Sequence, residues 1–232
     1  MPLKAVIFDV DGTLAETEEG HRAAFNQAFH ETGLDWFWDR ARYADLLHVT
    51  GGRERMRAFH ERQFPGAPAP DFAALHRRKN EIYAEIASDL LLSPGIADLI
   101  RTLQAEDITL AIATTTSPEN VAALLGKHFA EAWRTIFPVV MAGDAVPRKK
   151  PDPAVYLAAL EALGCRPQEA VAIEDSPSGV AAARAASIPI IAIPSLYFAD
   201  ADFSTADHVA ADATGVSLHL LRRLAAPDAP GR

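Results

Sequence analysis

Two aspartates, Asp9 and Asp11, directly follow a short apolar run at residues 5–8. Such a run is typical of a buried β-strand. Carboxylates at the end of a buried strand cost free energy unless a cation compensates their charge. Alternation along an extended chain points both side chains to the same side, and the Gly12-Thr13 pair permits a tight turn with forward-facing backbone N–H groups. We therefore expect a carboxylate pair, a Mg²⁺ ion and an anion-binding turn at the end of one strand.

Three later segments place further polar residues at the ends of expected elements. Thr114 ends an apolar run, Lys150 stands in Arg-Lys-Lys-Pro-Asp-Pro just before a helical pattern, and Glu174-Asp175 ends another apolar run. Together with the first acid pair they match the needs of phosphoryl transfer. That reaction requires an in-line nucleophile, compensation for the phosphoryl oxygens and a group that handles the proton of the leaving oxygen.

Each side chain suits one of these catalytic roles. Asp9 is the candidate nucleophile, because a carboxylate can attack phosphorus and form an aspartyl phosphate. Asp11 can protonate the leaving oxygen and then accept a proton from the attacking water, as general acid/base. Thr114 can donate its hydroxyl to a phosphate oxygen. Lys150 supplies a positive charge between the acids.

The metal ligands are expected among the same acids. Asp175 is suited to complete a Mg²⁺ site with Asp9 and the backbone carbonyl of Asp11, and Glu174 is a further ligand, direct or through water. Each piece alone also has an ordinary explanation: an acid pair can cap a turn, and Lys-Pro-Asp-Pro can simply start a helix. It is the occurrence of all four segments in this order that favours a catalytic site.

The bulk composition excludes several classes of protein. The formal net charge of the 232 residues is -9, which argues against general binding to nucleic acid or an anionic membrane. Cys165 is the single cysteine, so no internal disulfide and no cysteine-rich metal site is expected. No apolar stretch reaches membrane-spanning length, and the start has no secretory pattern. We expect a cytoplasmic monomer that acts on a small molecule.

The elements that must position these residues alternate along the chain. Five strand-like runs are expected at residues 5–10, 109–114, 136–141, 170–173 and 188–193. Helical spacing or capping signals separate the later ones, at residues 95–104, 119–127, 153–163 and 178–186. This alternation predicts an α/β fold, a Rossmann-like, doubly wound parallel sheet with helices on both faces. Ligands bind such sheets at the carboxyl ends of the strands.

One segment interrupts the alternation. Residues 16–92 contain no good buried strand and are predicted to form an α-helical cap, interrupted by the proline-rich stretch 64–70. The core then comprises residues 1–15 and 93–232. A lid that closes over the acid pair is one hypothesis for the insert, and a rigid bundle without a functional role is the other. The tail, residues 225–232, is expected to fray.

With these motifs in place, the chain resembles the haloacid dehalogenase superfamily of phosphohydrolases over essentially its whole length. The motifs are Asp9-Val10-Asp11-Gly12-Thr13, Thr114, Lys150 and Glu174-Asp175. The resemblance implies obligatory Mg²⁺, an aspartyl phosphate on Asp9 and a helical cap. With an aspartate at position 11, the chain resembles the phosphatases and phosphomutases of the superfamily rather than its dehalogenases.

A narrower resemblance is to the CbbY-like sugar phosphatases, relatives of β-phosphoglucomutase. It rests on residues 16–21, 35–40, 50–55 and 113–117, of which Trp-Phe-Trp at 36–38 and Thr-Gly-Gly-Arg at 50–53 are the more specific. It implies hydrolysis of xylulose 1,5-bisphosphate, a misfire product that inhibits Rubisco. We also expect Trp36 and Trp38 to pack in the core of the cap.

A bisphosphate needs a second anion site, and the cap offers candidates. Arg53 and Arg55 can grip the distal phosphate with their forked guanidinium groups, although most surface arginines are simply solvated. Gly51 and Gly52 can let backbone N–H groups approach the ligand. For a second basic cluster at residues 77–79 there are two interpretations: one of its residues reaches the site, or the cluster is a solvated helix face, and we favour the solvated face.

Five further residues are assigned to substrate binding. Glu18 can bond sugar hydroxyls, and His21 can orient Asp11 or the substrate, although a packed histidine is an equally ordinary reading. Tyr43 can contact the sugar or pack. Thr115 and Thr116 follow Thr114 at the strand end.

Three alternative functions stay open at this point. A phosphomutase of this family carries a lysine three positions beyond the motif threonine, where this chain has Ser117, which disfavours a mutase. A phosphoglycolate-type or general sugar-phosphate phosphatase would differ only in the cap. A non-enzymatic binding protein would be expected to lose one of the motif residues, and none is lost.

Overall fold

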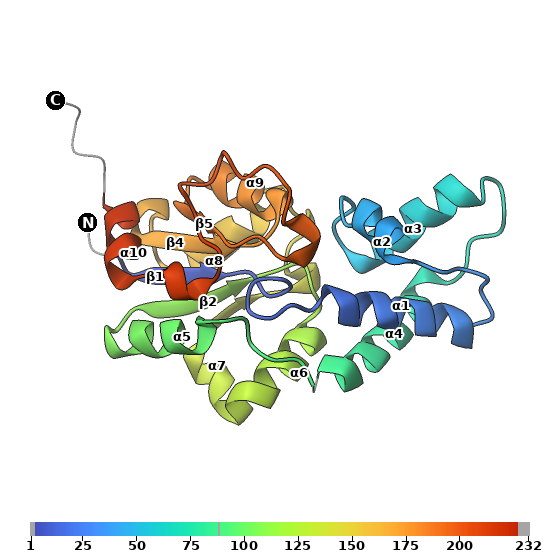
Figure 1. The fold of residues 1–232 in the computed structure, drawn as a ribbon, viewed down its shortest axis with the longest axis horizontal. Helices are drawn as coiled ribbons and strands as arrows, with labels where there is room; N and C mark the ends of the chain where they lie inside the picture. Colours follow the sequence, from blue (N-terminus) through green and yellow to red (C-terminus); the bar gives the residue numbers. More distant parts are fainter. Residues whose placement is uncertain (1–2, 88, 227–232) are drawn as a thin grey trace.

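A parallel six-stranded sheet forms the centre of the protein in this computed structural model, which describes residues 3–87 and 89–226 (Figure 1). The strand order is β3-β2-β1-β4-β5-β6, and every neighbouring pair is parallel. The strands are β1 (Ala5–Phe8), β2 (Thr109–Ala113), β3 (Val139–Met141), β4 (Ala170–Glu174), β5 (Ile190–Ala192) and β6 (His208–Val209).

Helices cover both faces of this sheet, because its central strands β1 and β4 are fully buried and apolar except for Glu174 at the end of β4. Val6 and Phe8 of β1 pack with α5, α6, α7 and α10, whereas Ala5 and Ile7 pack with α8 and α9. These helices are α5 (Ile96–Ala105), α6 (Pro118–Phe129), α7 (Trp133–Ile136), α8 (Ala154–Leu163), α9 (Pro177–Ala185) and α10 (Leu218–Ala225). Five 3₁₀ turns lie among them: Ala130–Ala132, Gly143–Ala145, Pro167–Glu169, Leu196–Phe198 and Ala213–Gly215.

The predicted Rossmann-like α/β fold is confirmed, with local corrections. The strand expected from residue 136 begins only at Val139, because residues 133–136 complete a helical turn whose Trp133 packs in the core. The strands expected to reach residues 10 and 114 end at Phe8 and Ala113. Strand β6 was not predicted, since its two residues carry no apolar run.

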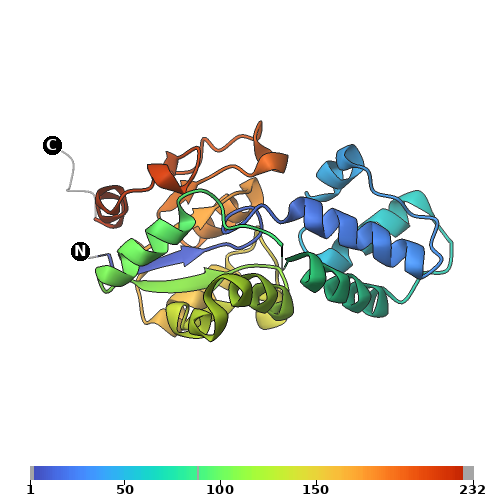
Figure 2. The ribbon, with the colours of Figure 1, turned by 60° about the horizontal axis from the view of Figure 1, so that its bottom comes forward.

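Four helices form a separate cluster with its own core beside the sheet, called the cap below (Figure 2). They are α1 (Glu18–Glu31), α2 (Arg40–Leu46), α3 (Gly52–Gln63) and α4 (Phe72–Ala87). The proline-rich stretch separates α3 from α4, and Trp36 and Trp38 are buried in the cap core as expected.

The chain passes from sheet to cap and back through adjacent segments. Ala15 pairs with Leu92 in an isolated bridge, and the N–H of Ser93 donates to the carbonyl of Leu14 at 2.8 Å. The two crossings between sheet and cap therefore lie side by side. Among the described residues no helix is long and apolar enough to span a bilayer. Most of the tail predicted to fray, residues 227–232, lies outside the described residues.

Candidate active site

The loop after β1 brings Asp9 to the carboxyl edge of the sheet. The N–H of Asp9 donates to the carbonyl of Ile173 at 3.0 Å, which ties the start of this loop to β4. Gly12 follows with a φ of +82°, a conformation that side chains disfavour. A Cβ at Gly12 would also lie 2.2 Å from Oδ2 of Asp175. Glycine is therefore required for the close approach between this loop and the end of β4.

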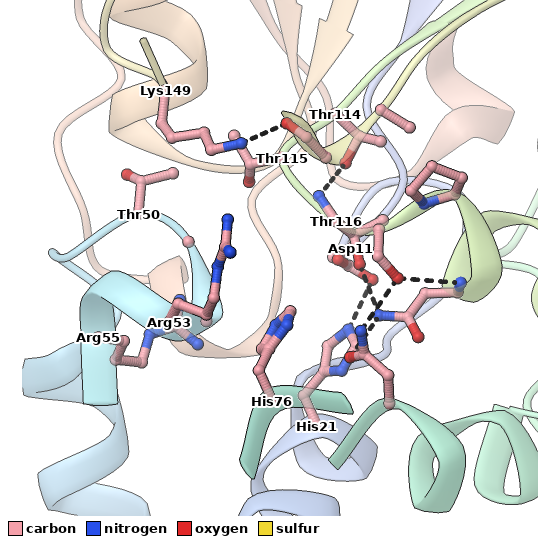
Figure 3. A pocket seen from close by; sticks show the side chains of 18 of the residues that line it. Asp11, His21, Thr50, Arg53, Arg55, His76, Thr114, Thr115, Thr116 and Lys149 are labelled. Carbon is pink, nitrogen blue, oxygen red and sulfur yellow. Dashed lines mark hydrogen bonds and ion pairs between the residues drawn. The ribbon is translucent and has the colours of Figure 1, made fainter. Parts of the chain in front are cut away.

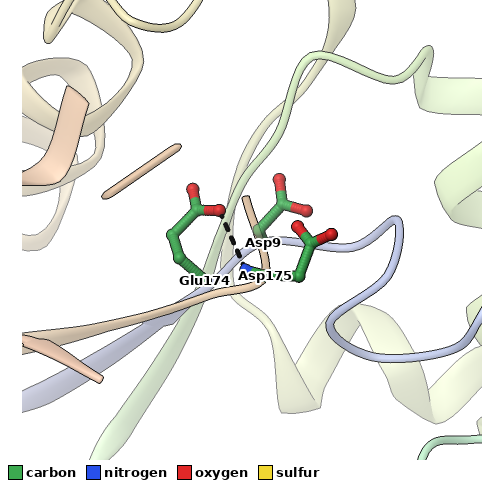
Figure 4. Close-up of side chains that lie close together, drawn as sticks. All are labelled: Asp9, Glu174 and Asp175. Atoms are coloured by element: carbon green, nitrogen blue, oxygen red, sulfur yellow. Dashed lines mark hydrogen bonds between the residues drawn. The ribbon is translucent and has the colours of Figure 1, made fainter. Parts of the chain in front are cut away.

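Asp9, Glu174 and Asp175 form a buried carboxylate cluster at the ends of the adjacent strands β1 and β4 (Figure 4). One oxygen from each lies within 4.8 Å of the others. Burial raises the pKa of Asp9 to about 7, against the lowering effect of Lys150. Burial, followed by the charges of Asp9 and Glu174, raises the pKa of Asp175 well above its ordinary value. Burial makes the negative charge of these carboxylates costly, and their oxygens are hard ligands. The cluster therefore fits a Mg²⁺ ion.

Lys150 lies between two members of this carboxylate cluster. Its Nζ donates to Oδ1 of Asp9 at 2.7 Å, to Oε1 of Glu174 at 2.6 Å and to the carbonyl of Ala113 at 2.9 Å. Burial alone would lower the pKa of Lys150, but the two carboxylates outweigh it and raise the pKa. Lys150 is therefore a fixed ammonium that offsets part of the charge of the cluster.

Two residues that hold these carboxylates were missed by sequence reasoning. Tyr156 of α8 is fully buried and donates its hydroxyl to Oε1 of Glu174. The Ser195 hydroxyl donates to Oδ2 of Asp175 at 2.5 Å. Ser195 had a usable signal, because it follows the apolar run 188–193 and so reaches the same edge of the sheet. Tyr156 had none, since it occupies an ordinary apolar position of a helix.

We expect Ser195→Ala to weaken Mg²⁺ binding by about tenfold, in the range found when a hydrogen bond to a metal-ligating carboxylate is removed. Titration calorimetry with MgCl₂ measures the change without turnover. Ser178→Ala is the matched control, because Ser178 lines the cavity but its hydroxyl contacts that of Ser176. Equal Mg²⁺ affinities in Ser195→Ala and the wild type would contradict this role.

Asp11 points toward the cap. Its Oδ1 accepts hydrogen bonds from Oγ1 of Thr17 at 2.7 Å and from Nε2 of His21 at 3.0 Å. Lys79 Nζ donates to Nδ1 of His21 at 2.7 Å, which leaves the ring proton on Nε2. His21 also stacks on Tyr83, with ring centroids 3.8 Å apart. The expectation that His21 orients Asp11 therefore agrees with the geometry.

The pKa shifts of the hydrogen-bonded residues Lys79, His21 and Asp11 differ from those of the carboxylate cluster around Asp9. Burial would raise the pKa of Asp11, but His21 and Thr17 outweigh it and hold the pKa below its ordinary value. Burial lowers the pKa of His21 and brings that of Lys79 to about 7.

The solvated-face interpretation of residues 77–79 is wrong for Lys79, which is 3% exposed. The period of α4 turns Lys79 inward, while Arg78 pairs with Glu31 and Glu81 on the surface.

A cavity of about 1160 Å³ lies between cap and core and contains most of the predicted site (Figure 3). The predicted residues that line it are Asp9, Asp11, Glu18, His21, Gly51, Gly52, Arg53, Arg55, Thr114, Thr115, Thr116, Lys150 and Asp175. Glu174 and Tyr43 lie behind its wall. The cavity therefore exposes the acid pair to a space that the cap residues also face.

Tyr43 supports the cavity wall from behind. It is fully buried, its hydroxyl donates to Oε2 of Glu18 at 2.6 Å, and it accepts from Nη1 of Arg55 at 3.1 Å. Its predicted contact with the substrate would thus pass through Glu18. Arg55 is itself 9% exposed and also stacks over the Tyr43 ring, so it is less available to a ligand than Arg53.

Gly52 and Arg53 begin α3 at the mouth of the cavity. A Cβ at Gly52 would lie 2.6 Å from Nε2 of His76, so glycine lets α3 approach α4 closely. Burial, together with the charges of Lys79 and Arg53, lowers the pKa of His76 to about 4. The Arg53 guanidinium donates from Nη2 to Oδ2 of Asp144 in the core at 2.8 Å.

The threonines after β2 form the opposite wall. The Thr116 N–H donates to Oγ1 of Thr114 at 3.3 Å, and Asn120 donates to Oγ1 of Thr116 at 3.0 Å. Ser117 caps α6 and accepts from Nδ2 of Asn80, a residue of the cap helix α4, at 3.2 Å. Position 117 is therefore used in a contact between core and cap.

Known proteins resemble this chain along nearly its whole length. The family model of the haloacid dehalogenase-like hydrolases matches residues 3–187. Protein CbbY of Rhodobacter capsulatus is 49% identical over 209 residues, which are 89% of this chain and 92% of that protein. The plasmid-encoded Protein CbbY of Cupriavidus necator is 45% identical over 211 residues, 88% of this chain and 83% of that protein.

Solved structures of a similar protein carry ligands. The crystal structure of CbbY from Rhodobacter sphaeroides in complex with phosphate matches with a TM-score of 0.88 at 46% identity, covering 94% of this chain and 99% of that one. An Asp-to-Asn mutant of the same protein, in complex with xylulose 1,5-bisphosphate, matches with a TM-score of 0.88 at 45% identity and the same coverage.

Proposed function

This chain belongs to the haloacid dehalogenase-like hydrolase family, and we propose that it is a Mg²⁺-dependent phosphatase that hydrolyses xylulose 1,5-bisphosphate through an aspartyl phosphate. Its role would be the clearance of a Rubisco inhibitor. The observation that carries the reaction type is geometric: two aspartates of one loop line the same cavity in different surroundings, Asp9 bonded to Lys150 and Asp11 bonded to His21 and Thr17. Two neighbouring carboxyl groups with divergent environments are suited to different tasks.

Asp9 is the proposed nucleophile. Lys150 fixes its Oδ1, which orients Oδ2 for in-line attack on phosphorus. Thr114, 2% exposed and on the cavity wall, would donate its hydroxyl to a phosphoryl oxygen. Asp9, Asp175 and the carbonyl of Asp11, with Glu174 directly or through water, would hold a Mg²⁺ ion that neutralises developing charge on the phosphoryl group.

Asp11 is the proposed general acid/base. The chain Lys79–His21–Asp11 supports this role, because Lys79 Nζ can pass a proton to Nδ1 of His21 while Nε2 of the same ring passes one to Asp11. A protonated Asp11 can then give its proton to the leaving sugar oxygen, and the resulting carboxylate can accept a proton from the water that attacks the aspartyl phosphate.

The cap supplies the proposed specificity. Glu18, held by Tyr43, would accept hydrogen bonds from sugar hydroxyls. Arg53 would grip the distal phosphate with a forked contact. The bisphosphate bound by the Rhodobacter sphaeroides protein supports this choice of substrate class. A phosphomutase is disfavoured, because Ser117 stands where the mutases carry a lysine and here caps α6.

The test of this function is phosphate release from a panel of pentose and hexose mono- and bisphosphates, with and without Mg²⁺. We expect xylulose 1,5-bisphosphate to be hydrolysed best and ribulose 1,5-bisphosphate to be strongly rejected. Conversion of a hexose 1-phosphate to its 6-phosphate without phosphate release would establish a mutase instead. A folded protein that neither releases phosphate from any member of the panel nor converts the hexose 1-phosphate would contradict the proposed enzymatic activity.

We expect Arg53→Ala to raise KM for xylulose 1,5-bisphosphate by about 10- to 100-fold, the loss typical of a charge-assisted hydrogen bond. Monophosphate substrates should be nearly unaffected, because they lack the distal group. Steady-state kinetics on both classes measures the difference, and Arg62→Ala, which loses an ion pair on the outer surface of the cap, is the control. Equal losses for both classes would exclude Arg53 from the distal site.

A further inference from the structure

A carboxylate already lies between two cations of the cavity wall. Oδ2 of Asp144 accepts from Nη2 of Arg53 at 2.8 Å, and its Oδ1 accepts from Nζ of Lys149, also at 2.8 Å. Arg53 belongs to the cap helix α3, whereas Asp144 and Lys149 belong to the core. All three residues line the cavity. Each carboxylate oxygen is thus paired with a cation from a different part of the protein.

This anion site is separate from the catalytic end of the cavity. Figure 3 shows Lys149 and Arg53 on the same side of the cavity, facing it together with Thr50, and well apart from Asp11 and His21. Several cations line this cavity, and Arg53 and Lys149 are two of them that converge on one carboxylate, that of Asp144. A substrate with its reacting phosphate at Asp9 would direct a second anionic group toward this side.

The bond between Asp144 and Arg53 is weak enough to be exchanged. The side chain of Asp144 is 72% exposed and that of Arg53 is 43% exposed, while Lys149 is only 15% exposed. Exposed ion pairs contribute little free energy, because solvent screens them. A phosphate dianion carries more charge and more acceptor oxygens than one carboxylate, so it would interact more strongly with the same two cations.

We propose that Asp144 is an internal competitor for the distal anion site, and that Arg53 and Lys149 together bind the second phosphate of the substrate once Asp144 is displaced. This inference rests on the proposed function. Its consequence is selectivity: a monophosphate offers nothing to replace Asp144 and leaves the contact between cap and core as it is. A bisphosphate exchanges that carboxylate for its own phosphate and bridges the same two cations.

The test measures binding without turnover, in the Asp9→Asn background, by titration calorimetry with xylulose 1,5-bisphosphate and xylulose 5-phosphate. We expect Asp9→Asn/Asp144→Asn to bind the bisphosphate about two- to fivefold more tightly, the range of an exposed ion pair. The affinity for the monophosphate should stay unchanged. Adding Lys149→Met instead should weaken the bisphosphate and spare the monophosphate.

Controls separate this local competition from general electrostatics. Asp98→Asn removes an exposed acid of α5 outside the cavity and should change neither affinity. The gain in bisphosphate affinity from Asp144→Asn should be smaller in an Arg53→Ala background, because residue 144 then has no ion pair with residue 53 to lose. Tighter binding of both ligands, or weaker binding of the bisphosphate, would overturn the role of Asp144. If neither ligand binds the Asp9→Asn protein, the proposed function itself is wrong.

Discussion

Asp9→Asn is expected to lower kcat by a factor on the order of 10⁴ or more while leaving substrate binding largely intact. An amide oxygen is a poor nucleophile, so the aspartyl phosphate does not form. The substitution keeps the shape of a side chain that is only 6% exposed. It also removes one negative charge that would repel the bound phosphate. The substrate affinity should therefore be equal to or higher than that of the wild type.

Single-turnover phosphate release and calorimetric titration with xylulose 1,5-bisphosphate separate the two effects in Asp9→Asn. Asp45→Asn, which loses an exposed ion pair with Arg62, should behave as the wild type in both measurements. Trapping of a phosphoenzyme from the wild type, and its absence from Asp9→Asn, would support the covalent route. Turnover retained in a purified Asp9→Asn protein would assign the attack to another group.

Lys150→Met is expected to cost about 3–5 kcal/mol of stability in metal-free buffer near pH 8, because it leaves buried carboxylates without their ammonium. Met has a similar volume, so packing changes little. The Lys150 charge lowers the pKa of Asp9, and its removal raises that pKa further. We also expect turnover to fall, since Asp9 must be ionised to attack phosphorus.

The destabilisation in Lys150→Met has a defined pH dependence. Below the ordinary Asp pKa of 3.8, Asp9 is protonated in both the folded and the unfolded state and contributes nothing. As the pH rises toward the raised folded pKa, the unfolded state loses its proton first and the folded state becomes relatively less stable. The loss in the variant should therefore be larger near pH 8 than near pH 5.5.

Urea unfolding in EDTA at both pH values measures this effect, with Lys127→Met as the matched control, because Lys127 is exposed on α6. Added Mg²⁺ should restore part of the stability of Lys150→Met, since a cation at the cluster replaces the lost charge. A pH-independent loss of stability would mean that Lys150 contributes packing rather than charge compensation.

Much of the fold and of the catalytic end of the site was predictable from the sequence. Apolar runs alternate with helical patterns, and this fixes the sheet and the edge where its strands end. Asp9, Thr114 and Asp175 directly follow or end such runs, so their convergence needs only the rule that parallel strands share one carboxyl edge. Boundaries were less certain: the helical turn α7 and the short strand β6 carry no distinct pattern.

The partners of these residues were decided by tertiary structure. Lys79 meets His21 across 58 residues, and Arg53 meets Asp144 across 91. Helical spacing indicates which positions of α4 share a face, but it does not indicate which face turns inward when the cap packs on the core. A lysine in a basic cluster is therefore read as solvated until packing buries it.

The sequence by itself determined which residue types reach the carboxyl edge of the sheet, and the tertiary structure decided which partners surround them. Two aspartates two residues apart are enough to suggest a nucleophile and an acid/base. Burial raises the pKa of Asp9 against the effect of Lys150, whereas His21 and Thr17 lower the pKa of Asp11, and these effects act only once the chain is folded. The physical reason is that side-chain type is local, whereas charge compensation depends on distances set by packing between cap and core.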